Sequence, residues 1–123
     1  MAVELNHTIV HSRDMGAGAA FLGRILDVPV GEQWGPFVPV QLGATTLDYM
    51  DDEEHFTPQH YAFLVSDDEF DAGLARLHED GIQIWADPGL SEPDVINHHY
   101  GGRGVYFKDP DGHVLELITA PYS

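Results

Sequence analysis

Cysteine is absent from the 123-residue sequence. This absence excludes disulfide bonds and thiolate ligands, so a bound metal ion would be held by nitrogen and oxygen atoms. No apolar run approaches the roughly 20 residues that a membrane-spanning helix needs. The N-terminus also lacks the basic and then apolar regions of a signal peptide. We therefore expect a cytoplasmic protein that does not enter a membrane.

Basic residues are scarce. Five Lys and Arg stand against 21 Asp and Glu, which gives a formal net charge of −16. Such a chain repels nucleic-acid phosphates and anionic lipids, so we expect neither as a partner. The simplest interpretation of this charge is a surface adapted for solubility. An anionic ligand would need one of five cations, namely Arg13, Arg24, Arg76, Arg103 and Lys108.

The pattern of the first half of the sequence recurs in the second half. Residues 5–11 (LNHTIVH) and 59–65 (QHYAFLV) alternate in polarity as half-buried strands do. A helix pattern follows each strand, with N-caps expected within 12–14 and 66–68. Three short strands then complete each half, at 28–34, 37–42 and 45–50, and at 82–85, 103–108 and 113–119.

The predicted fold is therefore α+β, with two strand–helix–strand–strand–strand modules. The length and the 43% of apolar residues fit one domain over 1–123, with module one at about 1–53 and module two at about 58–120. Pro39 inside a predicted strand favours an edge position or a bulge. The segment 86–102, rich in Pro, Gly, Asn and His, is predicted to be a loop over the functional site.

Two histidines and two carboxylates occupy repeated positions. His7 and His60 lie on the first strand of each half, and Asp48 and Glu116 lie on the last strand between large apolar residues. Burying a carboxylate between apolar side chains costs folding free energy unless the carboxylate is paired with a cation or binds a metal ion. We predict one central metal site for Fe(II), Mn, Ni, Co or Zn, with coordination positions left open for a substrate.

Each of these residues also has a structural interpretation. A strand histidine is often only a packed or edge residue, and Glu116 is near Arg103 and Lys108 in sequence, so it can instead form an ion pair. Asp48 is one carbon shorter than Glu and precedes the acidic run 51–54, which is also typical of a solvated strand edge.

The stretch 108–113 (KDPDGH) predicts a three-residue hairpin loop with a bulge. This loop pairs Asp109 with His113 and sets Tyr106 opposite Glu116 on the same face of the sheet. A tyrosine hydroxyl there can donate to a substrate oxygen or act as a general acid. The alternative is aromatic packing across the strands.

Other candidate residues lie in or beside the long loop. Arg103 is the best candidate for holding an anionic substrate group, and the glycines around it allow movement. The alternative is a flexible surface loop that includes His98, His99 and Tyr100. Four further histidines have no partner that the sequence indicates and are predicted to lie on the surface, namely His11, His55, His78 and His113.

These motifs resemble the glyoxalase, bleomycin-resistance and extradiol-dioxygenase group, the vicinal oxygen chelate superfamily. The resemblance rests on 6–8 (NHT), 60–63 (HYAF) and 106–113 (YFKDPDGH) running to Glu116. It implies paired βαβββ modules that form a cupped, partly open, barrel-like mixed sheet around the metal. It also implies a homodimer whose sites combine halves from two chains.

The resemblance implies ligands from the first and last strand of each module, which correspond to His7, Asp48, His60 and Glu116. In glyoxalase I-like members all four positions bind the metal, and the position that corresponds to Asp48 is a Glu. In fosfomycin-resistance-like members three ligands suffice, which correspond to His7, His60 and Glu116.

The stretch from Asn97 to Glu116 is also similar to ring-cleaving extradiol dioxygenases. There the tyrosine and the loop histidine lie beside Fe(II), which implies roles for Tyr106 and His99. Those enzymes are usually about twice as long and carry a base-like histidine where this chain has 45–48 (TTLD).

Three functions remain open from the sequence. The first is a divalent-metal-dependent enzyme whose small substrate chelates the metal through neighbouring oxygens, while Tyr106, His99 and Arg103 position it and move protons. Its reaction is lyase or isomerase chemistry, thiol transfer or ring-cleaving dioxygenation. The second is a metal-free, bleomycin-resistance-like protein that sequesters a drug. The third is a structural or interaction protein.

Overall fold

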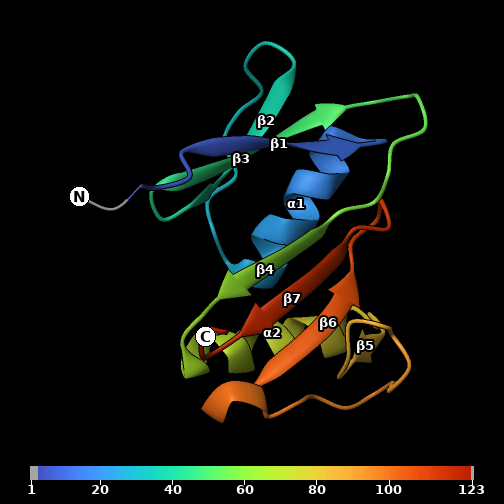
Figure 1. Ribbon diagram of the computed structural model, residues 1–123. Coiled ribbons are helices and arrows are strands. Elements are labelled where there is room, and N and C mark those ends of the chain that lie inside the picture. The colour runs from blue at the N-terminus through green and yellow to red at the C-terminus, as the bar shows by residue number, and fades with distance from the viewer. Residues whose placement is uncertain (1–2, 123) are drawn as a thin grey trace. The chain divides into compact units, whose positions relative to one another are not determined.

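The structure is a computed structural model that describes residues 3–122. Its internal contacts divide the chain into two compact units, Met1–Thr57 and Pro58–Ser123 (Figure 1). In the part of the chain described, each unit has one α-helix and its own mixed sheet, so the predicted α+β class is confirmed. Among residues 3–122, no helix is both long enough and apolar enough to cross a membrane.

The first unit is a three-stranded sheet with one helix. Its elements are β1 (His7–Ser12), α1 (Met15–Leu26), β2 (Phe37–Leu42) and β3 (Thr45–Asp51). The strand order is β1-β3-β2, with β1 parallel and β2 antiparallel to β3. Helix α1 begins where the Asp14 side chain accepts the Ala17 N–H, as a helix N-cap does. The helix buries Ala19, Leu22 and Ile25, and the strands bury Val10, Val40, Leu47 and Tyr49.

The opposite face of this sheet carries the candidate ligands. His7 pairs with Thr46, and Ile9 pairs with Asp48, so these four side chains share one face. Pro39 pairs with Asp48 on the other side of β3. Because β2 is the outermost strand of the sheet, the expected edge position of Pro39 is confirmed.

The predicted strand at 28–34 is wrong. Only two isolated bridges form there among the described residues, Val30 with Val40 and Trp34 with Phe37. Pro29 has no N–H to donate to a neighbouring strand, which limits regular pairing. A tight turn then reverses the chain, since the N–H and C=O groups of Trp34 and Phe37 bond to each other at 2.9 and 3.1 Å.

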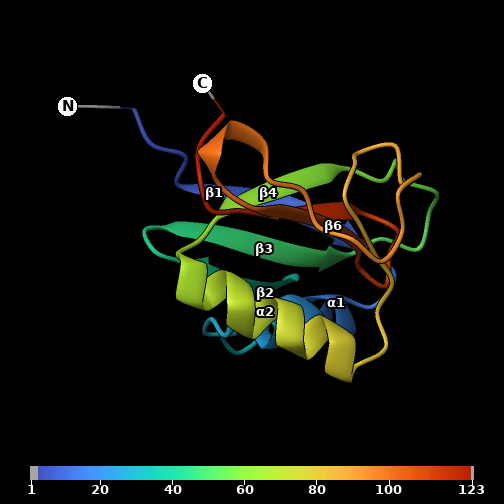
Figure 2. The ribbon, with the colours of Figure 1, turned by 90° about the horizontal axis from the view of Figure 1, so that it is seen from below.

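The second unit is a four-stranded sheet with α2 on one side (Figures 1 and 2). Its elements are β4 (His60–Leu64), α2 (Asp67–Glu79), β5 (Ile84–Trp85), a 3-10 turn (His99–Gly101), β6 (Gly104–Lys108) and β7 (Val114–Ile118). The strand order is β4-β7-β6-β5, with β4 parallel to β7. A capping box of Ser66 and Glu69 begins α2.

The hairpin between β6 and β7 forms as predicted. The Asp109 N–H donates to the His113 carbonyl at 3.0 Å, and Gly112 has a φ of +85°, a value that favours glycine. This loop sets the register of the two strands, so Tyr106 pairs directly with Glu116. One face of the second sheet therefore presents His60, Glu116 and Tyr106 together.

Candidate metal centre

A histidine and a buried carboxylate face each other across β4 and β7. His60 Nε2 lies 3.2 Å from Glu116 Oε1. The Glu116 side chain is 1% exposed, whereas the His60 side chain is 50% exposed. The Glu116 carboxylate is therefore buried against the sheet, whereas the His60 ring is open to solvent on one side.

The hydrogen bonding of His60 determines which ring nitrogen carries the hydrogen. Nδ1 lies 2.8 Å from the Val114 carbonyl oxygen, which can only accept a hydrogen bond. Nδ1 therefore donates to this carbonyl, and if the ring is neutral its Nε2 presents a lone pair to Glu116. Two acceptors at 3.2 Å need a proton or a cation between them. Two ligand atoms that bind the same metal ion, each at about 2.1 Å from it, lie about 3 Å from each other. The separation of His60 Nε2 and Glu116 Oε1 therefore fits a shared metal ion.

Two tyrosines complete the surroundings of Glu116. The Tyr122 hydroxyl donates to Glu116 Oε2, and the Tyr106 hydroxyl lies 3.1 Å from that of Tyr122. The Tyr106 ring also stacks on His60, with centroids 6.0 Å apart. Burial raises the pKa of Tyr106 far above its usual range, and the hydrogen bonds to Tyr122 and Glu116 add to the effect. Tyr106 is therefore a neutral phenol that retains its proton near neutral pH.

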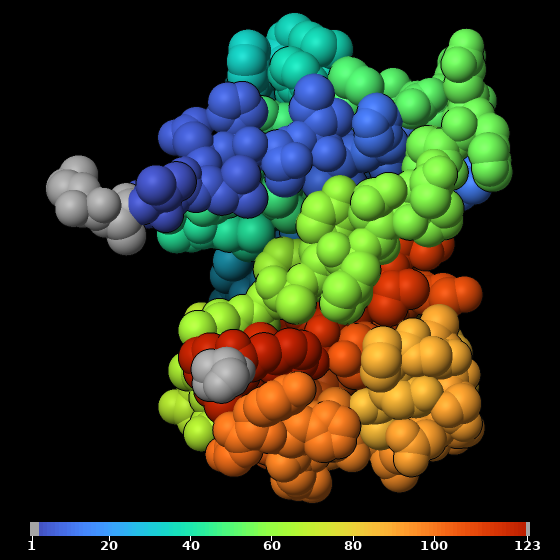
Figure 3. All heavy atoms as spheres, viewed as in Figure 1, coloured from blue at the N-terminus to red at the C-terminus, as the bar shows by residue number. Residues whose placement is uncertain are grey.

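The long loop reaches this cluster through aromatic contacts. The Tyr100 ring packs on Tyr122 with centroids 4.5 Å apart, and Figure 3 shows the 3-10 turn in orange beside the red C-terminal residues. His99 is exposed, packs against Tyr100 and donates its backbone N–H to Asn97. The structure thus links His99 to Glu116 through Tyr100 and Tyr122.

Arg103 binds the start of α2. Its guanidinium donates to Asp71 Oδ1 at 2.7 Å and to Asp67 Oδ1 at 2.9 Å, and it lies over the Phe70 ring. Arg103 therefore pairs with Asp67 and Asp71, and the alternative ion pair of Arg103 with Glu116 is wrong. Substrate binding by Arg103 stays a prediction, and it requires an anion that competes with two carboxylates.

His7 in the first unit shows the same hydrogen-bonding pattern as His60. Its Nδ1 lies 2.7 Å from Asn6 Oδ1, an acceptor, so Nδ1 donates there, and if the ring is neutral its Nε2 keeps a lone pair. A histidine that ligates a metal through one ring nitrogen almost always donates the hydrogen on the other. Asp48 shares this face of the sheet and is 6% exposed.

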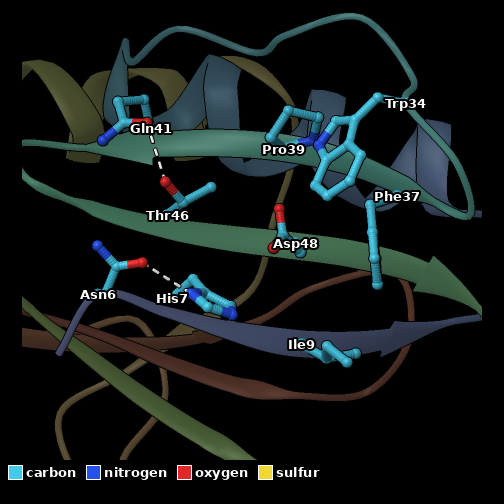
Figure 4. Close-up of a pocket in the computed structure, with 9 residues that line it drawn as sticks. All are labelled: Asn6, His7, Ile9, Trp34, Phe37, Pro39, Gln41, Thr46 and Asp48. Carbon is cyan, nitrogen blue, oxygen red and sulfur yellow. Dashed lines mark hydrogen bonds between the residues drawn. The ribbon is translucent and has the colours of Figure 1, made fainter.

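A cavity of about 380 Å³ lies over the same face (Figure 4). Figure 4 shows Trp34 and Phe37 at one end of the cavity, Gln41, Thr46 and Asn6 at the other, and Asp48 between them. The remaining lining residues are His7, Ile9 and Pro39. All nine lining residues belong to the first unit.

The hairpin contains a second group with potential ligand atoms. Asp109, Asp111 and His113 are buried, and their ligand atoms lie within 4.8 Å of one another. The prediction that His113 lies on the surface is therefore wrong, since it is 1% exposed. The Gln59 N–H donates to His113 Nδ1 at 2.9 Å, so in the neutral ring the hydrogen is on Nε2. Asp109 Oδ1 accepts the backbone N–H of Asp111 and of His113.

Burial raises the pKa of Asp109, an effect that the neighbouring His113 and the backbone hydrogen bonds to Asp109 oppose. A protonated Nε2 donates to carboxylates and does not ligate a metal. The hydrogen bonds of this group therefore fit stabilisation of the turn better than they fit metal binding.

The sequence motifs of the chain match a known superfamily. The sequence profile described as Glyoxalase/Bleomycin resistance protein/Dioxygenase superfamily matches residues 4–117. The chain belongs to this superfamily. Solved structures with low sequence identity share the fold. One example is a lactoylglutathione lyase from Agrobacterium tumefaciens, with 18% identity and a TM-score of 0.73, where the match covers 95% of this chain and 93% of the lyase.

Several relatives are enzymes by name. The glutathione transferase FosA of Serratia marcescens is 30% identical over 124 aligned positions, which cover 95% of this chain and 81% of FosA. The metallothiol transferase FosB of Shouchella clausii is 38% identical over 60 positions, or 49% of this chain and 37% of FosB. The structure of the oxidase ChaP-H2 shares 52% identity and a TM-score of 0.96, and the match covers 100% of this chain and 98% of ChaP-H2.

Proposed function

We propose that this protein is a divalent-metal-dependent enzyme of the glyoxalase/dioxygenase type. Its substrate is a small molecule that chelates the metal through neighbouring oxygens. The proposal rests on one observation, the contact of His60 Nε2 with Glu116 Oε1 at 3.2 Å while His60 Nδ1 bonds to a carbonyl oxygen. Such a pair of lone-pair donors is what a divalent cation needs.

The proposed ligand set is His7, His60 and Glu116, with Asp48 as a candidate fourth ligand. His7 supports this set because Asn6 leaves its Nε2 lone pair available, as Val114 does for His60. Histidine nitrogens and carboxylate oxygens suit Fe(II), Mn, Ni, Co or Zn. We also propose a homodimer in which each site combines halves from two chains, as the sequence resemblance implies.

When bound, the metal would act as a Lewis acid that polarises the substrate oxygens. Tyr106 is placed to donate a hydrogen bond to a substrate oxygen, because its hydroxyl lies in the Glu116 cluster and remains protonated. The Tyr100 and Tyr122 rings pack on each other beside the cluster, on the side of the C-terminal residues. His99 and Arg103 remain proposed substrate-contacting residues from the long loop.

The relatives favour two reactions. Oxidation of the substrate is favoured by the identity of 52% with the oxidase ChaP-H2 over the full chain. Thiol transfer is favoured by the weaker similarity to FosA, at 30% identity. We propose oxidation as the first reaction to assay, since the similarity to ChaP-H2 is higher and covers nearly all of both chains.

Metal content is the first measurement. Protein purified without chelators or tags, then supplied with Fe(II), Mn, Ni, Co or Zn, is expected to hold about one ion per chain by elemental analysis. Bound iron would direct assays to oxygenation of catechols, and the other ions would direct them to glyoxalase-like or thiol-transfer reactions. No bound ion under any of these conditions, with tight binding of a bleomycin-like drug, would establish the metal-free sequestering function instead.

Replacing Tyr122 by phenylalanine is expected to weaken metal binding. The Tyr122 hydroxyl donates to Glu116 Oε2 and so holds the carboxylate with Oε1 toward His60. Loss of an outer hydrogen bond to a ligand typically costs about 10–100-fold in metal affinity. Competition with a chromophoric chelator measures the change. Tyr100→Phe is the matched control, and equal affinities of the two variants would show that Tyr122 does not orient Glu116.

A further inference from the structure

The cavity of the first unit has the size and the lining of a small-molecule site. Its volume is about 380 Å³, within the range of roughly 300–1,000 Å³ typical of ligand pockets. One end is apolar, with Trp34, Phe37, Pro39 and Ile9, and the other end carries amide and hydroxyl groups (Figure 4). His7 and Asp48, two proposed metal ligands, also line it.

Trp34 lines one end of this cavity and begins a hydrogen-bonded turn (Figure 4). Its side chain is 59% exposed although indole is strongly apolar. The reciprocal backbone hydrogen bonds between Trp34 and Phe37 hold the turn, and Gly35 supplies the left-handed φ of +54°. The Phe37 ring lies 5.4 Å from the Trp34 ring, tilted by 53°. The two rings form the aromatic end of the cavity, where the face of an indole can stack on a flat ligand.

The charges around the cavity disfavour an anionic ligand. The nine lining residues include no Lys or Arg, and Asp48 contributes a carboxyl group. The net charge of −16 adds to the repulsion of anions. Thr46 donates to Gln41 Oε1 at 3.0 Å, which orients the Gln41 amide at the polar end of the cavity.

We propose that this cavity binds the ring system of a planar, fused-ring aromatic substrate that has vicinal oxygens and no anionic group, and that Trp34 is the residue that selects for it by stacking. This inference rests on the proposed function, in which the vicinal oxygens face the metal site that includes His7. Trp34 is thus a specificity-determining residue that favours flat multi-ring substrates over small anions and over aliphatic diols.

Binding of 2,3-dihydroxynaphthalene by full-length protein tests the proposal, both with metal and after chelator treatment. Stacking of one ring on an aromatic side chain contributes enough for Trp34→Ala to weaken binding about tenfold or more. Trp34→Phe is expected to retain most of the affinity because a ring remains. Catechol should bind more weakly than the naphthalene diol, and 1,2-cyclohexanediol and methylphosphonate should bind weakest. Because Trp34 is largely exposed, its replacement is not expected to disturb folding.

Equal affinity of wild type and Trp34→Ala for the naphthalene diol would overturn the proposal, as would equal binding of the cyclic aliphatic diol. Measuring binding both with metal and after chelator treatment distinguishes failure of this inference from failure of the proposed function. Trp34-dependent binding by a protein that takes up no metal would support the cavity while contradicting the enzyme. Metal uptake with unchanged binding in Trp34→Ala would contradict the cavity alone.

Discussion

His60→Ala is expected to abolish stoichiometric metal binding. The substitution removes the Nε2 lone pair that lies 3.2 Å from Glu116 Oε1 and leaves a buried carboxylate without its histidine partner. Loss of an outer hydrogen bond already costs about 10–100-fold in affinity, so loss of a ligand should exceed about 100-fold. Elemental analysis and chelator competition measure the loss, and circular dichroism reports whether the variant is folded.

His78→Ala is the matched control for this experiment. His78 is exposed on α2, so the same substitution there should leave metal binding unchanged. The His7→Ala variant should lose the metal as His60→Ala does. A metal retained in His60→Ala would exclude His60 as a ligand. Loss in His60→Ala with full retention in His7→Ala would exclude His7 as a ligand.

His113→Leu is expected to lower the free energy of unfolding by about 2–4 kcal/mol, through the loss of hydrogen bonds to buried groups. The His113 side chain is 1% exposed and accepts the backbone N–H of Gln59 at 2.9 Å. Leucine fills a similar volume but removes this acceptor. It also leaves the buried Asp109 and Asp111 without the imidazole beside them.

Urea unfolding of His113→Leu measures this effect, with His55→Leu as the control at an exposed position. Because Gln59 precedes His60, the variant should also bind metal more weakly even where it is fully folded. Equal unfolding free energies of the two variants would show that the buried imidazole does not stabilise the hairpin.

The hairpin between β6 and β7 shows how much local chemistry predicts. Pro110 and Gly112 specify the turn, and the turn sets the register that places Tyr106 opposite Glu116. The interactions involved span only a few residues, so they are present in the sequence pattern itself. The alternation of the strands and the N-caps of both helices were predictable for the same reason.

The region before β2 shows where sequence patterns fail. Residues 28–34 alternate like a strand but form only isolated bridges in the part of the chain described, because Pro29 interrupts pairing and the chain then turns at Gly35. That turn is what exposes Trp34 beside the cavity. No signal in the sequence distinguished this tryptophan from a core residue.

By itself, the sequence determined the α+β class, the order of nearly all strands and helices, the superfamily resemblance and the candidate ligands. Only the tertiary structure decided that His113 is buried, that Tyr122 bonds to Glu116 and that Arg103 binds α2. It also decided which partner His60 Nδ1 has, because the Val114 carbonyl lies 54 residues away in sequence. The Val114 contact depends on the parallel pairing of β4 with β7, two strands that are distant in sequence and are not joined by a tight turn that would set their register.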